Sequence, residues 1–184
     1  ADAKGNTVNI SGGTVNANGK IAGGYIAKNT TLATPAASAG NASGNTINIT
    51  GGTFGGNTVI YGGYTEGTGK ATGNIVNLGK ADGTLSATGL TNVTLYGGGG
   101  TSASDRVKDN VLNVNAKGVT AGSVANFAKI KFKIDSNVAD GDDVLTLTQN
   151  TTLAHSSIEE PTPAVISGWL GNTMEKTAHL IKMN

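Results

Sequence analysis

The chain has 184 residues, a formal net charge of +1 and no cysteine, and only 4% of its residues are aromatic. So few aromatic side chains cannot fill a wide globular core, whereas an apolar content of 37% is too high for a disordered chain. The balance of 13 basic and 12 acidic residues gives no field that would recruit nucleic acid or an anionic membrane. A slim core lined by aliphatic side chains, as in a repeat-built solenoid, fits these limits.

The sequence also lacks the usual signs of membrane insertion. No apolar run approaches the roughly 20 residues that span a bilayer, and the first residues lack the apolar core of a signal peptide. We expect no insertion of this chain into a membrane. If the protein is exported, we expect the chain to be a piece of a longer one.

A five-residue pattern recurs along the chain. It begins with Asn and has a second Asn three positions later in residues 6–10, 45–49, 74–78 and 110–114. Residues 143–147 keep its apolar pair but change the polar partners. The starting points are 39, 29, 36 and 33 residues apart. A kept motif at varying spacing indicates a fixed rung with loops of unequal length at its corners.

Each copy alternates apolar and polar residues, which predicts a strand with one inward face. Stacking the strands in parallel predicts one inward column, made of Val8, Ile47, Val76, Leu112 and Leu145. The second Asn of each copy predicts an outward amide ladder, made of Asn9, Asn48, Asn77 and Asn113. The first Asn lies at the start of each strand, at positions Asn6, Asn45, Asn74 and Asn110.

Glycine pairs mark the expected corners of each rung. Gly12-Gly13 and Gly51-Gly52 precede a second strand, and glycine permits the positive φ of a sharp turn. A third strand is expected to end in another glycine corner, in residues 21–25, 61–64 and 96–99. Three strands and three corners per rung predict an all-β parallel β-helix, a three-sided solenoid. Residues 29–43 and 97–109 are expected to be loops inserted at its corners.

Towards the C-terminus the repeat becomes less regular. Residues 127–134 are expected to form the last strand of the fourth rung, with Lys129, Lys131 and Lys133 on its outer face. This lysine stripe fits an anionic-ligand site, but we favour a solvated face that protects the strand. Residues 1–150 would be the regular rungs. Residues 151–184, the C-terminal segment, would form irregular final rungs and a cap of the same domain, with strands at 151–153, 164–166 and 179–181.

The motifs Asn-Thr-Val-Asn-Ile, Gly-Gly-Thr and Tyr-Gly-Gly-Tyr, together with residues 124–132 and 142–147, resemble a known family. They are similar to the passenger region of Gram-negative autotransporters, in its portion just before the membrane barrel. The resemblance covers nearly the whole chain. It implies a right-handed β-helix carried to the cell surface with the help of a C-terminal membrane barrel of the parent protein.

Carbohydrate-active enzymes also use β-helices, so we searched for paired carboxylates. The best cluster is Asp105-Arg106 with Asp109, which we interpret as a solvated loop. Residues 140–143, with three acids, could collect calcium, but a corner turn with acids in water is the favoured interpretation.

Three further patterns were weighed for chemistry. His155 and His179 stand alone without a cysteine, so no zinc site is predicted. Ser156-Ser157 near His155 has no acid in a position that would make a triad. Residues 97–100 lack the Lys and Ser/Thr of a phosphate loop and are interpreted as a corner. We therefore expect no catalytic, cofactor or metal site and no cofactor.

The sequence leaves two functional classes open. The first is a structural and adhesive module at the bacterial cell surface, not an enzyme, whose partners are molecules of host or neighbouring cells. The second is a β-helix enzyme that degrades polysaccharides. Glycan or cell binding without turnover would favour the first class, and carbohydrate cleavage the second.

Overall fold

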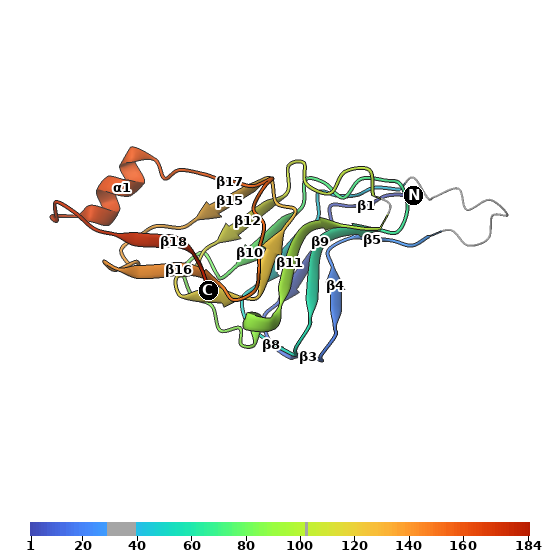
Figure 1. Ribbon diagram of the computed structural model, residues 1–184, viewed down its shortest axis with the longest axis horizontal. Helices are drawn as coiled ribbons and strands as arrows, with labels where there is room; N and C mark the ends of the chain where they lie inside the picture. The colour runs from blue at the N-terminus through green and yellow to red at the C-terminus, as the bar shows by residue number, and fades with distance from the viewer. Residues whose placement is uncertain (29–39, 102) are drawn as a thin grey trace.

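The computed structural model describes residues 1–28, 40–101 and 103–184, and within them the chain is mostly strands arranged in parallel sheets. Every strand pair in this part of the chain is parallel. The largest sheet has six strands, in the order β2 (Thr7–Ile10), β7 (Thr46–Ile49), β10 (Ile75–Leu78), β12 (Val111–Val114), β15 (Lys129–Phe132) and β17 (Ser157–Ile158). In Figure 1 successive strands follow one another along the molecule, from blue at the right to red at the left.

A second sheet is built from the first four of these repeats. Its members are β4 (Lys20–Ala22), β9 (Val59–Thr65), β11 (Thr94–Gly99) and β14 (Ser123–Ala125), and β5 (Tyr25–Ile26) also pairs with β9. Three smaller sheets are β1 (Ala3–Lys4) with β6 (Ala42–Ser43), β3 (Thr14–Val15) with β8 (Thr53–Phe54), and β13 (Val119–Ala121) with β16 (Asp142–Leu147) and β18 (Ala178–Met183). The helical elements are the 3-10 turn η1 (Leu90–Asn92) and helix α1 (Pro163–Leu170).

The predicted register is confirmed for four of the five segments. Val8 pairs with Ile47, Ile47 with Val76, and Val76 with Leu112. The fifth member was predicted wrongly, because Leu112 pairs with Ile130. Leu145 lies in another sheet, where its partners are Val119 and Ile181.

Strand β15 is therefore not the last strand of the fourth rung, as the sequence had suggested, but lies in the first column. Only 18 residues separate Val111 from its partner Lys129. Lys129-Ile130-Lys131-Phe132 alternates as well as residues 143–147 do, with Lys in place of Asn. Alternation alone does not show which sheet a strand joins.

The core is a narrow aliphatic column between the sheets. Its fully buried members include Ile47, Val76 and Leu112 from the six-stranded sheet, and Ile60 and Leu95 from the second sheet. Their burial follows from the alternation, since every second residue of these strands points inward. The inward positions of Ile47, Val76 and Leu112 were predicted from the sequence, and the structure confirms them.

Two asparagine ladders run along the six-stranded sheet. In the predicted outer ladder each side-chain amide donates to the preceding copy at 2.7 Å, through Asn48 to Asn9, Asn77 to Asn48 and Asn113 to Asn77. The first asparagines form an inner ladder that runs in the opposite direction. Asn6 donates to Asn45, Asn45 to Asn74, and Asn74 to Asn110, at 2.9, 3.0 and 3.2 Å. Asn45, Asn74 and Asn110 are fully buried.

The Tyr-Gly-Gly-Tyr motif was predicted to be a corner, but it lies inside a strand. Strand β9 continues through Gly62 and Gly63, and Figure 1 shows that the β9 and β11 ribbons bend without ending. A Cβ at Gly62 would lie 2.7 Å from the Cβ of Asn74, and one at Gly63 would lie 2.8 Å from its amide nitrogen. The glycines are needed here because the inner asparagine ladder packs directly against this backbone. The same correction applies to residues 97–99, which belong to β11.

The Gly12-Gly13 and Gly51-Gly52 corners are confirmed, because Gly13 and Gly52 have φ values of 81° and 98° directly before β3 and β8. The predicted loop 29–43 is shorter than expected, since Ala42–Ser43 pairs with β1, and residues 29–39 lie outside the described part. The loop predicted at 97–109 begins only after Gly99.

The C-terminal segment differs from its prediction in two places. Residues 151–153 form no strand, and residues 164–166 lie in α1. Thr162 caps this helix by accepting a bond from Val165 N, and Pro163 follows at its first position. Residues 179–181 do form a strand, within β18. Within residues 1–28, 40–101 and 103–184, no helix has the length and apolar character needed to cross a membrane.

Candidate functional site

Four tyrosines, all that the sequence contains, gather on one face of the second sheet. Because the strands are parallel and in register, Tyr61 of β9 pairs with Tyr96 of β11, and Tyr25 of β5 pairs with Tyr64 of β9. Both pairs stack, with ring centroids 4.9 and 5.8 Å apart. Tyr61 and Tyr64 meet edge to face at 4.7 Å. We call these four residues the tyrosine cluster.

Lys20, on the neighbouring strand β4, lies over this cluster. Its Nζ is 3.4 Å from the ring centroid of Tyr64, 5.4 Å from that of Tyr61 and 5.8 Å from that of Tyr25. A ring face attracts an ammonium group through its quadrupole. Among the described residues no carboxylate forms an ion pair with Lys20. The cluster therefore presents aromatic faces beside one cation that has no carboxylate within ion-pair distance in the described chain, with Glu66 as its longer-range electrostatic neighbour.

Glu66 fixes the outer edge of the cluster. The Tyr25 hydroxyl donates to Glu66 Oε1 at 2.6 Å, and the Lys28 N–H donates to Glu66 Oε2 at 3.0 Å. The bond from Tyr25 lowers the pKa of the Glu66 carboxyl and raises the pKa of the Tyr25 hydroxyl. Tyr25 stays 47% exposed, so its ring is held in place while much of it faces solvent.

Gly99 makes room for the rings. It pairs with Tyr64, and a Cβ at this position would lie 2.3 Å from the ring of Tyr61. The motif therefore changes from Tyr-Gly-Gly-Tyr in β9 to Tyr-Gly-Gly-Gly in β11. The tyrosine cluster was not predicted from the sequence, although the spacing of two tyrosines indicates it. Tyr25 follows Asn6 by 19 residues, as Tyr64 follows Asn45.

In the structure, Asp105, Arg106 and Asp109 shape the loop that contains them. Asp105 Oδ1 accepts bonds from Val107 N and Lys108 N at 3.0 and 3.1 Å, and the first of these lowers the pKa of the Asp105 carboxyl. Arg106 donates to the Gly100 carbonyl at 3.0 Å. Asp109 has a φ of 60°, as in a turn.

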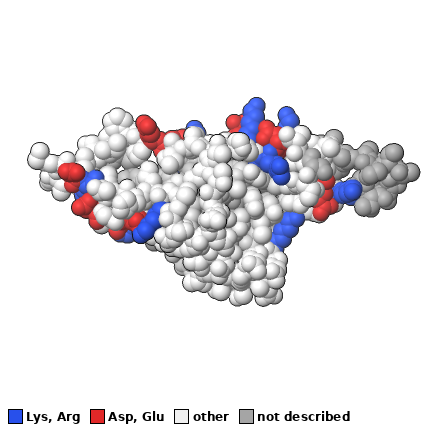
Figure 2. Space-filling view, viewed as in Figure 1, with Lys and Arg blue, Asp and Glu red and all other residues white. Residues whose placement is uncertain are grey.

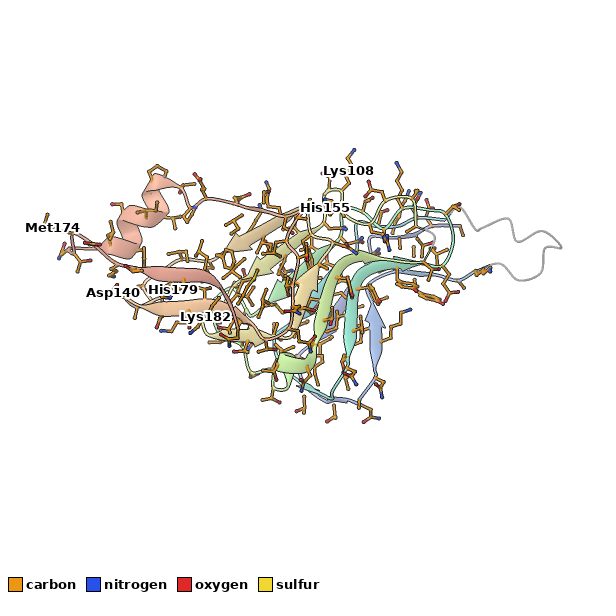
Figure 3. The ribbon with its side chains drawn as sticks, viewed as in Figure 1. Lys108, Asp140, His155, Met174, His179 and Lys182 are labelled. Atoms are coloured by element: carbon orange, nitrogen blue, oxygen red, sulfur yellow. The ribbon has the colours of Figure 1, made fainter. Side chains whose placement is uncertain are left out.

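The acids of residues 140–143 each have a different partner. Asp140 accepts from Thr177 N at 2.6 Å, Asp142 pairs with Lys117 at 2.7 Å, and Asp143 pairs with Lys182 and His179 at 2.9 Å each. Figure 3 shows Asp140, His179 and Lys182 along β16 and β18. In the described part of the chain, no group of three or more His, Cys, Asp or Glu side chains is placed to hold a metal ion.

The two histidines and the two serines considered in the sequence form no common site in the described chain. Figure 3 shows His155 and His179 in different parts of the molecule. The Ser156 and Ser157 hydroxyls donate to the carbonyls of Phe127 and Ala128 at 2.7 and 3.1 Å. Both hydroxyls thus bind backbone on the neighbouring strand.

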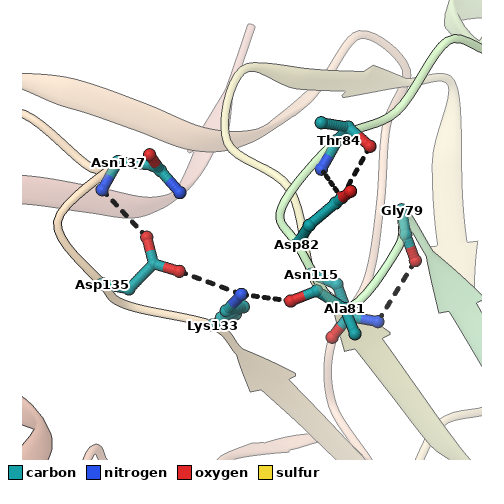
Figure 4. A network of polar contacts seen from close by, with 8 residues as sticks. All are labelled: Gly79, Ala81, Asp82, Thr84, Asn115, Lys133, Asp135 and Asn137. Atoms are coloured by element: carbon teal, nitrogen blue, oxygen red, sulfur yellow. Dashed lines mark hydrogen bonds and ion pairs between the residues drawn. The ribbon is translucent and has the colours of Figure 1, made fainter.

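The lysine stripe of β15 is paired with acids. Lys129 and Lys131 share Glu159 Oε2 at 3.0 and 3.2 Å, and these bonds lower the pKa of the Glu159 carboxyl. Lys133 pairs with Asp135 at 3.0 Å and donates to the Ala81 carbonyl. Figure 4 shows the contacts of Lys133, which join the segment after β15 to Ala81 in the segment after β10. The pairing supports the interpretation of the stripe as a protective, solvated face.

Comparison with known proteins found no match among family models, curated proteins or solved structures.

Proposed function

We propose that the chain is a right-handed parallel β-helix with three sides. Parallel pairing throughout the described strands supports this fold, as does the register kept across four repeats of unequal length. The first four repeats contribute strands to both the six-stranded sheet and the second sheet. The corner glycines and short strands such as β3 and β8 would form the third side.

The proposed role of this β-helix is that of a structural and adhesive module of a bacterial surface protein, as in an autotransporter passenger. The asparagine ladders support a structural role, because they hold the repeats together without a disulfide. The charged side chains in Figure 2 lie mostly along the upper rim and towards the two ends, and the lower part of that face is uncharged. The membrane barrel that would carry the module belongs to the parent protein.

The observation that carries the adhesive role is the tyrosine cluster. The aliphatic column fills the interior, so these rings are not needed in the core. Tyrosine gives a rigid contact surface at low conformational entropy cost, since it has few rotatable bonds. A surface patch of aromatic rings beside a cation is typical of a binding site for another molecule.

Adhesion is tested with the whole chain coated on beads and offered to host epithelial cells and to bacterial cells. We expect coated beads to adhere, and beads coated with the Leu112→Asp variant, whose core is disrupted, to stay free. Absence of adhesion to every cell type would contradict the proposal.

The enzyme alternative is tested separately. We expect no new reducing ends when the chain is incubated with pectin or chitin, because Asp105 and Asp142 are both engaged in local bonds. Turnover that Asp105→Ala or Asp109→Ala abolishes would overturn the non-enzymatic role.

A further inference from the structure

We propose that the tyrosine cluster with Lys20 binds an anionic polysaccharide, whose pyranose rings stack on tyrosine while a carboxylate or sulfate pairs with the lysine. This inference rests on the adhesive role and names the class of ligand. It concerns a surface of five side chains on β4, β5, β9 and β11: Lys20, Tyr25, Tyr61, Tyr64 and Tyr96.

The exposed ring of Tyr25 favours a ligand that stacks on it. Tyr25 stacks on Tyr64, and no other aromatic ring of the described chain stacks on it. A purely structural stack would hide this ring, yet Tyr25 is 47% exposed while its hydroxyl is anchored on Glu66. The face of an aromatic ring carries partial negative charge and attracts polarised C–H groups, such as those on one face of a pyranose.

A cationic ligand does not fit this cluster. An aromatic cluster can bind a cation, but here the Lys20 ammonium already lies 3.4 Å from the centre of Tyr64. A second cation at these rings would be repelled. A ligand that carries negative charge would be attracted to Lys20 instead, because no carboxylate of the described chain lies within ion-pair distance of its ammonium group and Glu66, at the edge of the cluster, interacts with it only at longer range.

The arrangement of the rings favours a polymeric ligand. The two stacked pairs follow the strand register, so the aromatic surface extends from β5 across β9 to β11. Tyr61 and Tyr64 join the pairs by an edge contact. A polymer of sugar rings can contact more than one tyrosine on such a surface, whereas a single small sugar cannot.

The test is a calorimetric titration of the whole chain with three hexameric probes: oligogalacturonate, a sulfated galactan fragment and neutral maltohexaose. We expect binding of at least one anionic probe, weakened by salt, and weaker binding of maltohexaose, which can stack on the rings but cannot pair with Lys20. The anionic probe that binds distinguishes carboxylate from sulfate as the recognised group. Equal binding of maltohexaose, or binding of no probe, would overturn the proposal.

Variants locate the binding. Tyr25→Ala is expected to raise Kd about tenfold, and Lys20→Gln about threefold to fivefold at low salt. Tyr25→Phe keeps the ring and should stay within about twofold of the wild type. Lys80→Gln removes an exposed lysine elsewhere and is the matched control, with no expected change. An unchanged Kd in Tyr25→Ala, or equal losses in Lys20→Gln and Lys80→Gln, would contradict the site.

Two further measurements complete the test. If Tyr25→Ala does not fold, the ring resonances of Tyr25 in the wild-type chain are followed by NMR during the titration, and they should shift with saturation. Resonances that stay in place would overturn the site. Bead adhesion is measured in parallel. Adhesion that persists without binding of any glycan probe would refute this inference and leave the adhesive role standing.

Discussion

The central repeats, residues 40–147, and the C-terminal segment, residues 151–184, differ in how they are stabilised. In the central repeats, inward side chains such as Ile47, Val76 and Leu112 are fully buried, and two asparagine ladders connect the strands. In the C-terminal segment, helix α1 has no buried residue and Met174 is 100% exposed. Burial in this fold therefore depends on having a neighbouring repeat on both sides.

The same contrast holds at the other end of the chain. Val8 and Ile10 point inward like Ile47 and Ile49, but they are only half-buried, because β2 is an outer strand of its sheet. The C-terminal segment covers its own end more fully. Strand β17 pairs with β15, β18 pairs with β16, and Trp169 donates to the Val138 carbonyl at 2.7 Å. Such contacts protect strand edges from pairing with other chains.

The largest effect is expected in the centre of the core. Leu112→Asp places a charge without a partner in the aliphatic column and should destabilise the fold by about 4–5 kcal/mol. The adjacent Asn113→Asp changes only the outer face, where Lys131 is the neighbour in register, and should cost less than about 1 kcal/mol. Urea unfolding followed by circular dichroism measures both. Equal losses would mean that the inner and outer faces are wrongly assigned.

The next largest effect separates the two asparagine ladders. Asn74→Ala removes the oxygen that accepts from the backbone N–H and the side-chain amide of Asn45, each at 3.0 Å, inside the fold. Leaving buried donors without partners should cost about 3 kcal/mol. Asn77→Ala, the same change in the half-buried outer ladder, should cost about 0.5–1 kcal/mol. The difference between their urea midpoints is the measurement, and a larger loss for Asn77→Ala would contradict the inner ladder's role.

The contrast between the two regions also explains how far the sequence could be interpreted. Four strands were predicted in register because each combines alternation with two asparagines at fixed positions. The fifth position was assigned to residues 143–147 instead of Lys129–Phe132 because both segments alternate and neither has the asparagines. Once the ladder residues are absent, periodicity identifies a strand but not its sheet.

The glycines and tyrosines were recognised as a motif, but their role was not predicted. A Cβ added at Gly62 would lie within 3 Å of atoms in the neighbouring repeats. The need for glycine at this position therefore depends on packing between repeats. The sequence shows only that glycine recurs there. Predicting the tyrosine cluster would have required the same three-dimensional information. Tyr61 and Tyr96 are cross-strand partners, but their positions in the sequence align only when an insertion between their repeats is taken into account.

A smaller effect is expected in the C-terminal segment. Trp169 is half-buried against Ile134 and Leu180, so Trp169→Ala should cost about 1–2 kcal/mol and open the segment locally. Hydrogen exchange should increase in β18 while β10 stays protected. Met174→Ala, at a fully exposed position, is the control and should change neither. Uniform loss of protection in both strands would show that the two regions unfold as one unit.

The smallest effect is a pH dependence confined to β16 and β18. The bond from Lys182 lowers the pKa of the Asp143 carboxyl below its ordinary value of 3.8, and His179 adds to this. A carboxyl whose pKa is lowered by folding stabilises the native state fully above its ordinary pKa, and this contribution is lost as the pH falls through the lowered value. The Tm difference between wild type and Asp143→Asn should therefore shrink as the pH falls from about 5 towards acid pH. Glu175→Gln, an exposed acid of the same segment, is the control and should give no pH-dependent difference. A gap that widens towards acid pH would show that Asp143 is not stabilised by Lys182 and His179 in the folded chain.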